Sequence, residues 1–195
     1  MAAPERGPRE RMVISAAQLI RRDGVTATGM RDVAVHAEAP RGSLQHYFPG
    51  GKEQLVNEAL EWAGGHAARR VERHLAELDE PSPSALFTAM VRRWADDCER
   101  DGFTSGCPVA AAAVDCSAGT DSHQAAAAAA FAHWTGPLAA ALTGLGVPAR
   151  RSKALATLMV SALEGALLIA RAERDARALT TVAKELGPLL DEAVA

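Results

Sequence analysis

The sequence predicts an all-α protein of about nine helices, and three observations support this fold class. Hydrophobic residues make up 48% and charged residues 23% of the 195-residue chain, which is enough apolar surface for a buried core. Aromatic residues reach only 4%, alanine is abundant and β-branched residues are few, so the composition favours helix over sheet. Apolar residues also recur three and four positions apart, and no segment reads as a convincing strand.

The first predicted helix runs from about residue 8 to residue 23. Its apolar residues between Val13 and Ile20 follow helical spacing and form one face. Gly24 comes next, and we expect it to end the helix because glycine adopts the left-handed backbone without a steric penalty.

Two short helices separated by a tight turn are predicted next. Thr28 can act as the N-cap of the first of them, which ends near His36. Pro40 disfavours helix at the residue before it and suits the first position of a new helix, so the second is expected over residues 41–48. A Pro-Gly-Gly turn at residues 49–51 follows.

The rest of the chain predicts six more helices, separated by turns rich in glycine, proline and serine. They span about residues 52–78, 85–101, 109–116, 122–146, 148–173 and 176–195. Gly64 and Gly65 are expected to weaken the first of these helices in its middle. Pro137 is expected to kink or break the fourth, and Pro188 to bend the last.

Charge is divided unevenly along the chain. Residues 1–52 carry eight Lys or Arg against five Asp or Glu, a net charge of +3, whereas residues 53–195 sum to −6. This asymmetry predicts a basic module that can approach an anion, attached to an acidic body.

The sequence also predicts a cytoplasmic protein. The three cysteines are odd in number and form no CxxC pair, which argues against a secreted disulfide framework. The opening MAAPERGPRERM is too polar for a signal peptide. The longest apolar stretch, residues 154–170, contains Ser161 and Glu164 and is too short and polar for a comfortable membrane span, so we interpret it as a buried or interfacial helix.

Two short helices joined by a tight turn, after a longer helix, are typical of a helix-turn-helix domain. Most side chains of the second short helix can reach DNA. Arg41 can bind guanine or phosphate and Gln45 can bind adenine in bidentate fashion. Ser43 and Tyr47 can contact phosphate, and Gly42 allows the backbone to approach a duplex closely.

This segment, PRGSLQHYFPGGKEQL, resembles the signature of the TetR family of bacterial transcriptional regulators, and GVTATGMRDVAVHA before it agrees. The later GCPVAAAAVD and ALEGALLIARAERD resemble most the LmrA/YxaF-type branch. The resemblance implies a helix-turn-helix DNA-binding domain at residues 1–52 and a helical ligand-binding and dimerisation domain at residues 53–195. It further implies a homodimeric repressor of a palindromic operator, released by a small, largely apolar effector, hydrophobic or aromatic in character.

The family pattern places eight residues at or near double-stranded DNA. They are Thr28, Arg41, Gly42, Ser43, Gln45, His46, Tyr47 and Lys52. Two positions depart from the pattern. Glu38 stands where the family usually has a glycine in the turn. It puts a Cβ where left-handed backbone is often needed and a negative charge near DNA. Gln45 stands where the family usually has an aromatic residue after the leucine of the third helix, and its amide can read a base.

The resemblance assigns the effector cavity and the dimer interface to the C-terminal helices. Candidate ligand-binding residues are Trp62, Phe87, Met90, Trp94, Phe103, Cys107, Trp134, Met159 and Glu164. Ordinary core packing is the alternative for the large apolar members. Glu164 could meet a cationic ligand, Arg171 of the partner subunit, or solvent. The last two helices are expected to pair across a two-fold axis as a four-helix bundle.

Other classes of protein have weaker support. The chain contains no GxSxG, HExxH or GxGxxG motif, and Pro49-Gly50-Gly51-Lys52 lacks the spacing of a phosphate loop, so we do not predict an enzyme. No cofactor and no metal site are predicted, because no usual zinc spacing is formed by Cys98, Cys107, Cys116, His123 and His133. The alternative that stays open is a dimeric small-molecule-binding protein of the same fold that has lost DNA binding.

Overall fold

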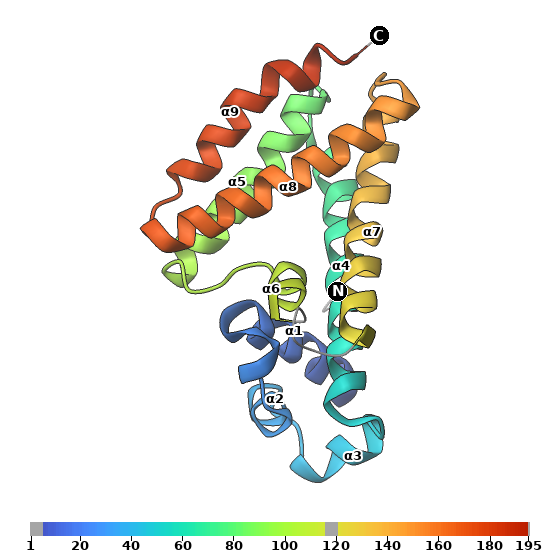
Figure 1. The fold of residues 1–195 in the computed structure, drawn as a ribbon, viewed down its shortest axis with the longest axis vertical. Coiled ribbons are helices and arrows are strands. Elements are labelled where there is room, and N and C mark those ends of the chain that lie inside the picture. Colours follow the sequence, from blue (N-terminus) through green and yellow to red (C-terminus); the bar gives the residue numbers. More distant parts are fainter. Residues whose placement is uncertain (1–5, 116–120, 195) are drawn as a thin grey trace. The chain divides into compact units, whose positions relative to one another are not determined.

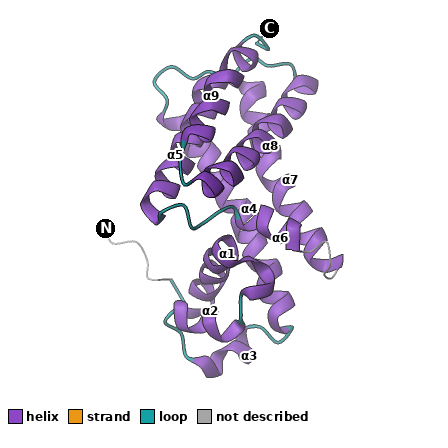
Figure 2. Ribbon diagram, turned by 60° about the vertical axis from the view of Figure 1, so that its left-hand side comes forward, coloured by secondary structure: helices purple, strands orange, loops and turns teal. Residues whose placement is uncertain are grey.

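A computed structural model of the chain describes residues 6–115 and 121–194 (Figure 1). Within these ranges the regular secondary structure is entirely helical, with nine α-helices, one 3-10 turn and no strand (Figure 2). The elements are α1 (Pro8–Ala27), α2 (Met30–His36), η1 (Arg41–Ser43), α3 (Leu44–Tyr47), α4 (Gly51–Glu77), α5 (Pro83–Asp101), α6 (Pro108–Asp115), α7 (Asp121–Gly144), α8 (Ala149–Glu173) and α9 (Arg177–Asp191). The predicted fold class is confirmed. Cys116 lies outside the described residues.

The chain divides into two compact units. The first comprises Met1–Gly64 and Cys107–Ala130, and the second comprises Gly65–Gly106 and Phe131–Ala195. The expected domain boundary after residue 52 falls at the start of α4, and α4 and α7 each contribute residues to both units.

In the first unit, α1 packs against α2 and α6. The core includes Met12, Ile20 and Phe48, none of which has measurable exposure. Gly24 has φ +86° and interrupts the helical backbone, which confirms the predicted end of the first helix, although a short helical turn follows it. The predicted N-cap role of Thr28 is wrong, because its hydroxyl donates to the carbonyl of Gly24 at 2.7 Å and closes α1 instead.

Gly64 lies at a close approach of α4 and α7 in the first unit. A Cβ at this position would lie 2.7 Å from the main-chain oxygen of Ala130. Helix α4 is continuous from Gly51 to Glu77, so Gly64 and Gly65 do not interrupt it. The expectation that they weaken the helix leaves out this packing role of Gly64. The absence of a side chain at Gly64 lets the two backbones approach closely.

In the second unit, α5 packs against α8 and α9. Ser82 caps α5 by accepting a hydrogen bond from the amide of Ala85 at 3.1 Å. The carboxylate of Asp191 accepts from the amide of Ser84 at 3.0 Å and ties the end of α9 to the start of α5. Pro137 and Pro188 lie inside α7 and α9, each of which remains one helix, so the expected break at Pro137 does not occur.

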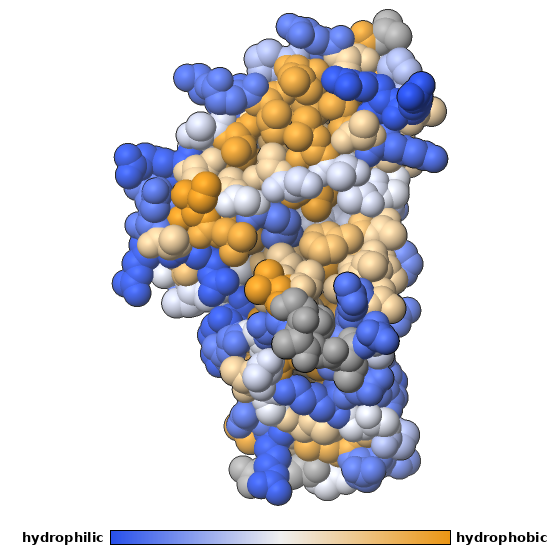
Figure 3. Space-filling model, viewed as in Figure 1, coloured by the Kyte–Doolittle hydropathy of each residue, from blue (hydrophilic) through white to orange (hydrophobic). Residues whose placement is uncertain are grey.

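The helices α7 and α8 are long and apolar enough to cross a membrane by length and composition alone. Core helices of water-soluble proteins pass the same test, and 33% and 44% of their most apolar windows are buried within the chain. Apolar side chains also gather on the surface over α8 and α9 (Figure 3). They include Leu158, Leu168, Ile169 and Leu189, which are 39%, 57%, 50% and 38% exposed.

Candidate nucleic-acid interface

The turn between α2 and η1 is built on a left-handed glutamate. Helix α2 ends with the amide of Glu38 donating to the carbonyl of Val35 at 3.1 Å and the amide of Ala39 donating to that of Ala34 at 3.0 Å. This pair of bonds is the Schellman arrangement, which places a left-handed residue just after the helix. Glu38 occupies that position with φ +50°, so the backbone demand anticipated at this departure from the family pattern is real.

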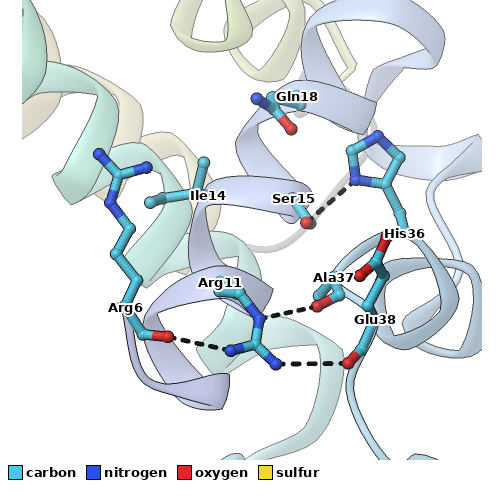
Figure 4. Close-up of a pocket in the computed structure, with 8 residues that line it drawn as sticks. All are labelled: Arg6, Arg11, Ile14, Ser15, Gln18, His36, Ala37 and Glu38. Atoms are coloured by element: carbon cyan, nitrogen blue, oxygen red, sulfur yellow. Dashed lines mark hydrogen bonds between the residues drawn. The ribbon is translucent and has the colours of Figure 1, made fainter. Parts of the chain in front are cut away.

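Arg11 of α1 holds this turn from the side (Figure 4). Its Nε donates to the carbonyl of Ala37 at 3.0 Å, and one terminal nitrogen donates to the carbonyl of Glu38 at 3.3 Å. The other terminal nitrogen donates to the carbonyl of Arg6 at 2.9 Å. This role of Arg11 could not be predicted from the sequence, because the contacts join positions 26 and 27 residues apart.

A cavity of about 580 Å³ lies beside these hydrogen bonds, between α1 and the turn (Figure 4). Most of its lining residues are of polar or charged type, and the ring of His36 lies 3.0 Å from the hydroxyl of Ser15, measured from Nδ1 to Oγ. This contact and those of Arg11 connect α1 to the end of α2 and to the turn after it.

The recognition segment is η1 followed by α3. Gln45 and His46 are exposed, Tyr47 is half-buried, and the rings of His46 and Tyr47 meet edge to face with centroids 5.2 Å apart. A Cβ at Gly42 would meet no atom within 4 Å, so the backbone there is open to close approach. The hydroxyl of Ser43 donates to the carbonyl of Pro40 at 2.5 Å. The side chain of Arg41 lies outside the described part of the chain.

Phe48 anchors the end of α3 in the core of the first unit. The guanidinium of Arg9 lies 5.3 Å from the centre of its ring and forms an ion pair with Glu58 at 2.7 Å. Arg9 therefore connects α1, the end of α3 and α4. The sequence pattern predicts the apolar anchor but not the arginine that packs on it, because that pairing depends on tertiary contacts.

Thr28 and Lys52 both lie near the kink in α1. Thr28 is buried, whereas Lys52 is half-buried and donates from Nζ to the carbonyl of Thr26 at 3.1 Å. The amide of Thr26 donates to the carboxylate of Asp115 at 3.1 Å. The last residue of α6 and the first turn of α4 are thus joined to the same peptide segment of α1.

The candidate ligand-binding residues are divided between the two units. Trp62 and Cys107 belong to the first, and the second contains Phe87, Met90, Trp94, Phe103, Trp134, Met159 and Glu164. Phe87, Met90, Trp134 and Met159 are buried. Trp94 and Trp134 come together with ring centroids 6.5 Å apart. Glu164 is half-buried, and Arg171 of the same chain donates to the carbonyl of Thr104 at 3.1 Å.

Arginines of α4 and α5 surround one buried carboxylate in the second unit. The carboxylate of Asp97 forms ion pairs with the guanidinium groups of Arg100, Arg93 and Arg70, with N–O distances of 2.7, 3.0 and 3.6 Å. The half-buried His66 lies in the same positive field, and burial, then repulsion from Arg70 and other arginines, lowers its pKa to about 4. His66 is therefore neutral at physiological pH.

The short α2, the tight turn and the exposed polar face of α3 define a helix-turn-helix DNA-binding protein. Residues 14–59 match the profile of the bacterial regulatory proteins of the tetR family, and residues 83–185 match the transcriptional regulator LmrA/YxaF-like C-terminal domain. The chain belongs to the TetR family, and its predicted placement in the LmrA/YxaF-type branch is confirmed.

Similar proteins agree with this assignment. The uncharacterized HTH-type transcriptional regulator Rv0196 of Mycobacterium tuberculosis is 41% identical over 189 residues, which cover 94% of each chain. The uncharacterized HTH-type transcriptional regulator YxaF of Bacillus subtilis is 26% identical over 93% of this chain and 94% of its own. A TetR transcriptional regulator from Legionella pneumophila shares the fold, with a TM-score of 0.80 and 23% identity over 96% of this chain and 100% of that one. The protein is therefore a DNA-binding transcriptional regulator, not an enzyme.

Proposed function

We propose that this regulator is a homodimeric, cytoplasmic repressor that binds a palindromic operator and is released by a small, largely apolar effector. The observation that carries the proposal is the recognition segment. Gln45 and His46 are exposed on α3, while Phe48 behind them is fully buried. A short helix that is anchored on one side and polar on the other can enter the major groove and present its side chains to base edges.

The proposed contacts with DNA are those that the family pattern implies. Arg41, Gly42, Ser43, Gln45, His46 and Tyr47 lie on the recognition segment within residues 1–52, the proposed DNA-binding domain. Lys52 lies in the first turn of α4, where backbone amides and the helix dipole also favour a phosphate. Thr28 is buried, so its proposed role is to support the backbone of the interface.

The proposed dimer interface is the exposed face of α8 and α9 in the second unit. Leu158, Leu168 and Leu189 are exposed apolar residues there (Figure 3). A Cβ at Gly165 would meet no atom within 4 Å, which leaves room for a close-packed partner helix. A two-fold pairing through this face would present two recognition helices about 34 Å apart to successive major grooves.

The proposed effector site lies among the large apolar residues of the second unit. Trp94 and Trp134 form an aromatic pair, and Phe87, Met90 and Met159 are buried in the same unit. Such a lining suits a hydrophobic or aromatic effector. The effector would weaken DNA binding only to the extent that it binds more tightly to the protein state that does not bind DNA. This coupling free energy is about 1 to 3 kcal/mol in typical cases.

The experiment that tests this function is selection of bound sequences from a random duplex pool, followed by a salt titration on the selected sequence. A palindromic consensus whose affinity falls steeply with salt would support the proposed repressor and supply the duplex for effector screening. Folded, dimeric protein that enriches no sequence would instead favour the DNA-silent ligand binder. The carboxylate of Glu38 in the turn is the observation that favours that second candidate.

A further inference from the structure

We infer that Arg11 is a positioning residue for the recognition helix, and that it acts by holding the backbone of the left-handed turn that Glu38 occupies. The inference rests on the proposed DNA binding and adds a residue that does not itself touch DNA. It concerns the four residues that join α2 to η1, since their conformation sets where the recognition segment begins.

The turn carries a steric cost at Glu38. At φ +50° the Cβ of an L-residue crowds the neighbouring carbonyl oxygen, whereas glycine adopts this conformation freely. The cost must be offset by contacts that exist only when the turn is formed. The two main-chain bonds of the Schellman arrangement, donated by Glu38 and Ala39, are one such set.

Arg11 supplies the second set. Its guanidinium binds two successive carbonyl oxygens, those of Ala37 and Glu38, and a planar fork of donors fits such a pair. The third bond, to the carbonyl of Arg6, holds the guanidinium of Arg11 beside the cavity (Figure 4). The bond to the carbonyl of Glu38 exists only if this residue keeps its left-handed conformation, because rotation there would turn the carbonyl away.

The same bonds argue against a direct role for Arg11 on DNA. Its Nε and both terminal nitrogens donate to main-chain oxygens of the protein. Arg11 therefore contributes to DNA affinity through the position of α3 and not through phosphate neutralisation. These two roles predict different salt dependences, because each lost phosphate contact reduces the slope of log affinity against log salt by about 1.

The test is a double-mutant cycle between positions 11 and 38, read out on the selected operator. Arg11→Met should weaken operator binding about tenfold, as expected from losing hydrogen bonds of a charged donor, with the salt slope unchanged. In the Glu38→Gly background, the same change should cost less than about threefold, because glycine holds the turn unaided.

Three control variants separate the alternatives. Glu38→Gln removes the carboxylate but keeps the Cβ, so Arg11→Met should still cost about tenfold in that background. Arg22→Met removes an arginine from the same helix that pairs with its neighbour Asp23, and it should leave operator affinity nearly unchanged. Arg11→Lys keeps the charge but cannot bridge both carbonyls, so it should also weaken operator binding about tenfold. This variant replaces Arg11→Met in the test if the methionine variant folds poorly.

The cycle is repeated by denaturant unfolding without DNA, which keeps this inference separate from the proposed function. Arg11→Met should lower the unfolding midpoint more in the Glu38 protein than in the Glu38→Gly protein. Additive effects in both cycles, or a salt slope that falls by about 1 in Arg11→Met, would overturn the inference. Wild-type protein that binds no duplex would reject the proposed function, and the unfolding cycle would still decide whether Arg11 holds the turn.

Discussion

The ammonium of Lys52 donates to the main-chain carbonyl of Thr26 at 3.1 Å, which joins the first turn of α4 to the kinked end of α1. Thr26 is in turn held by Asp115 of α6. The lysine proposed to bind phosphate is therefore positioned by the backbone of another helix before DNA arrives.

Lys52→Ala should weaken binding to every duplex and make the salt dependence shallower by about 1 unit of slope, because one phosphate contact is lost. A salt titration on operator and unrelated DNA measures both effects. Lys184→Ala is the matched control, since Lys184 is an exposed lysine on α9 in the second unit. An intact slope in Lys52→Ala would reject the phosphate assignment.

Gln45→Ala should relax the sequence preference at one or two base positions, because its exposed amide is proposed to read a base edge. The measurement is repeated sequence selection with the variant, compared base by base with the wild-type consensus. Uniform weakening on all operators would show that Gln45 does not read a base.

The two adjacent glycines of α4 should respond oppositely to alanine. Gly64→Ala would place a Cβ 2.7 Å from the main-chain oxygen of Ala130 and should lower the free energy of unfolding. At Gly65 the nearest atom is 3.3 Å away and belongs to the flexible side chain of Arg69, so Gly65→Ala should be neutral or stabilising by up to about 1 kcal/mol. Denaturant unfolding of both variants measures this, and equal effects would contradict the close packing of α4 on α7.

His66 should make stability fall in acid. Its pKa is lowered from 6.5 to about 4 by burial and then by Arg70, so the unfolded chain binds more protons than the folded one between these values. The contribution of neutral His66 is present above pH 6.5 and is lost as the pH falls towards 4. Unfolding midpoints measured across this range should decline less in His66→Asn than in wild type. An unchanged pH profile would exclude His66 as a source of the decline.

Leu168→Glu should convert the proposed dimer to monomer, because it places a carboxylate on the exposed apolar face of α8. Sedimentation velocity over a range of concentrations measures the oligomeric state. Ala76→Glu adds the same charge at an exposed position of α4, which is not part of the proposed interface, and serves as the control. A dimer that survives Leu168→Glu at micromolar concentration would place the interface elsewhere.

Features that depend on local chemistry could be predicted from the sequence. Gly24 ends the regular part of α1 because glycine can adopt backbone conformations that other residues avoid. Pro40 leads into the recognition segment because proline disfavours helix at the residue before it. The demand at Glu38 for left-handed backbone could also be anticipated, because the family pattern has glycine there.

Features that depend on partners far along the chain could not be predicted. Thr28 has the chemistry of an N-cap, but its hydroxyl bonds back to Gly24 because the kink brings that carbonyl within reach. The role of Arg11 requires knowing that the carbonyls of the turn face α1. In the same way, the sequence alone predicts that Gly64 weakens its helix. Its role becomes clear only from the structure, where the backbone of α7 lies beside it.

Gly24 is restricted for two independent reasons. Its φ of +86° disfavours any side chain, and a Cβ there would lie 2.6 Å from the carboxylate oxygen of Asp115. A substitution would strain the backbone and displace the carboxylate that holds Thr26 at once. Relieving either problem alone leaves the other in place, so no single compensating change elsewhere restores the site. Position 24 is thus closed to neutral evolutionary drift even if Asp115 is replaced, because the positive φ remains.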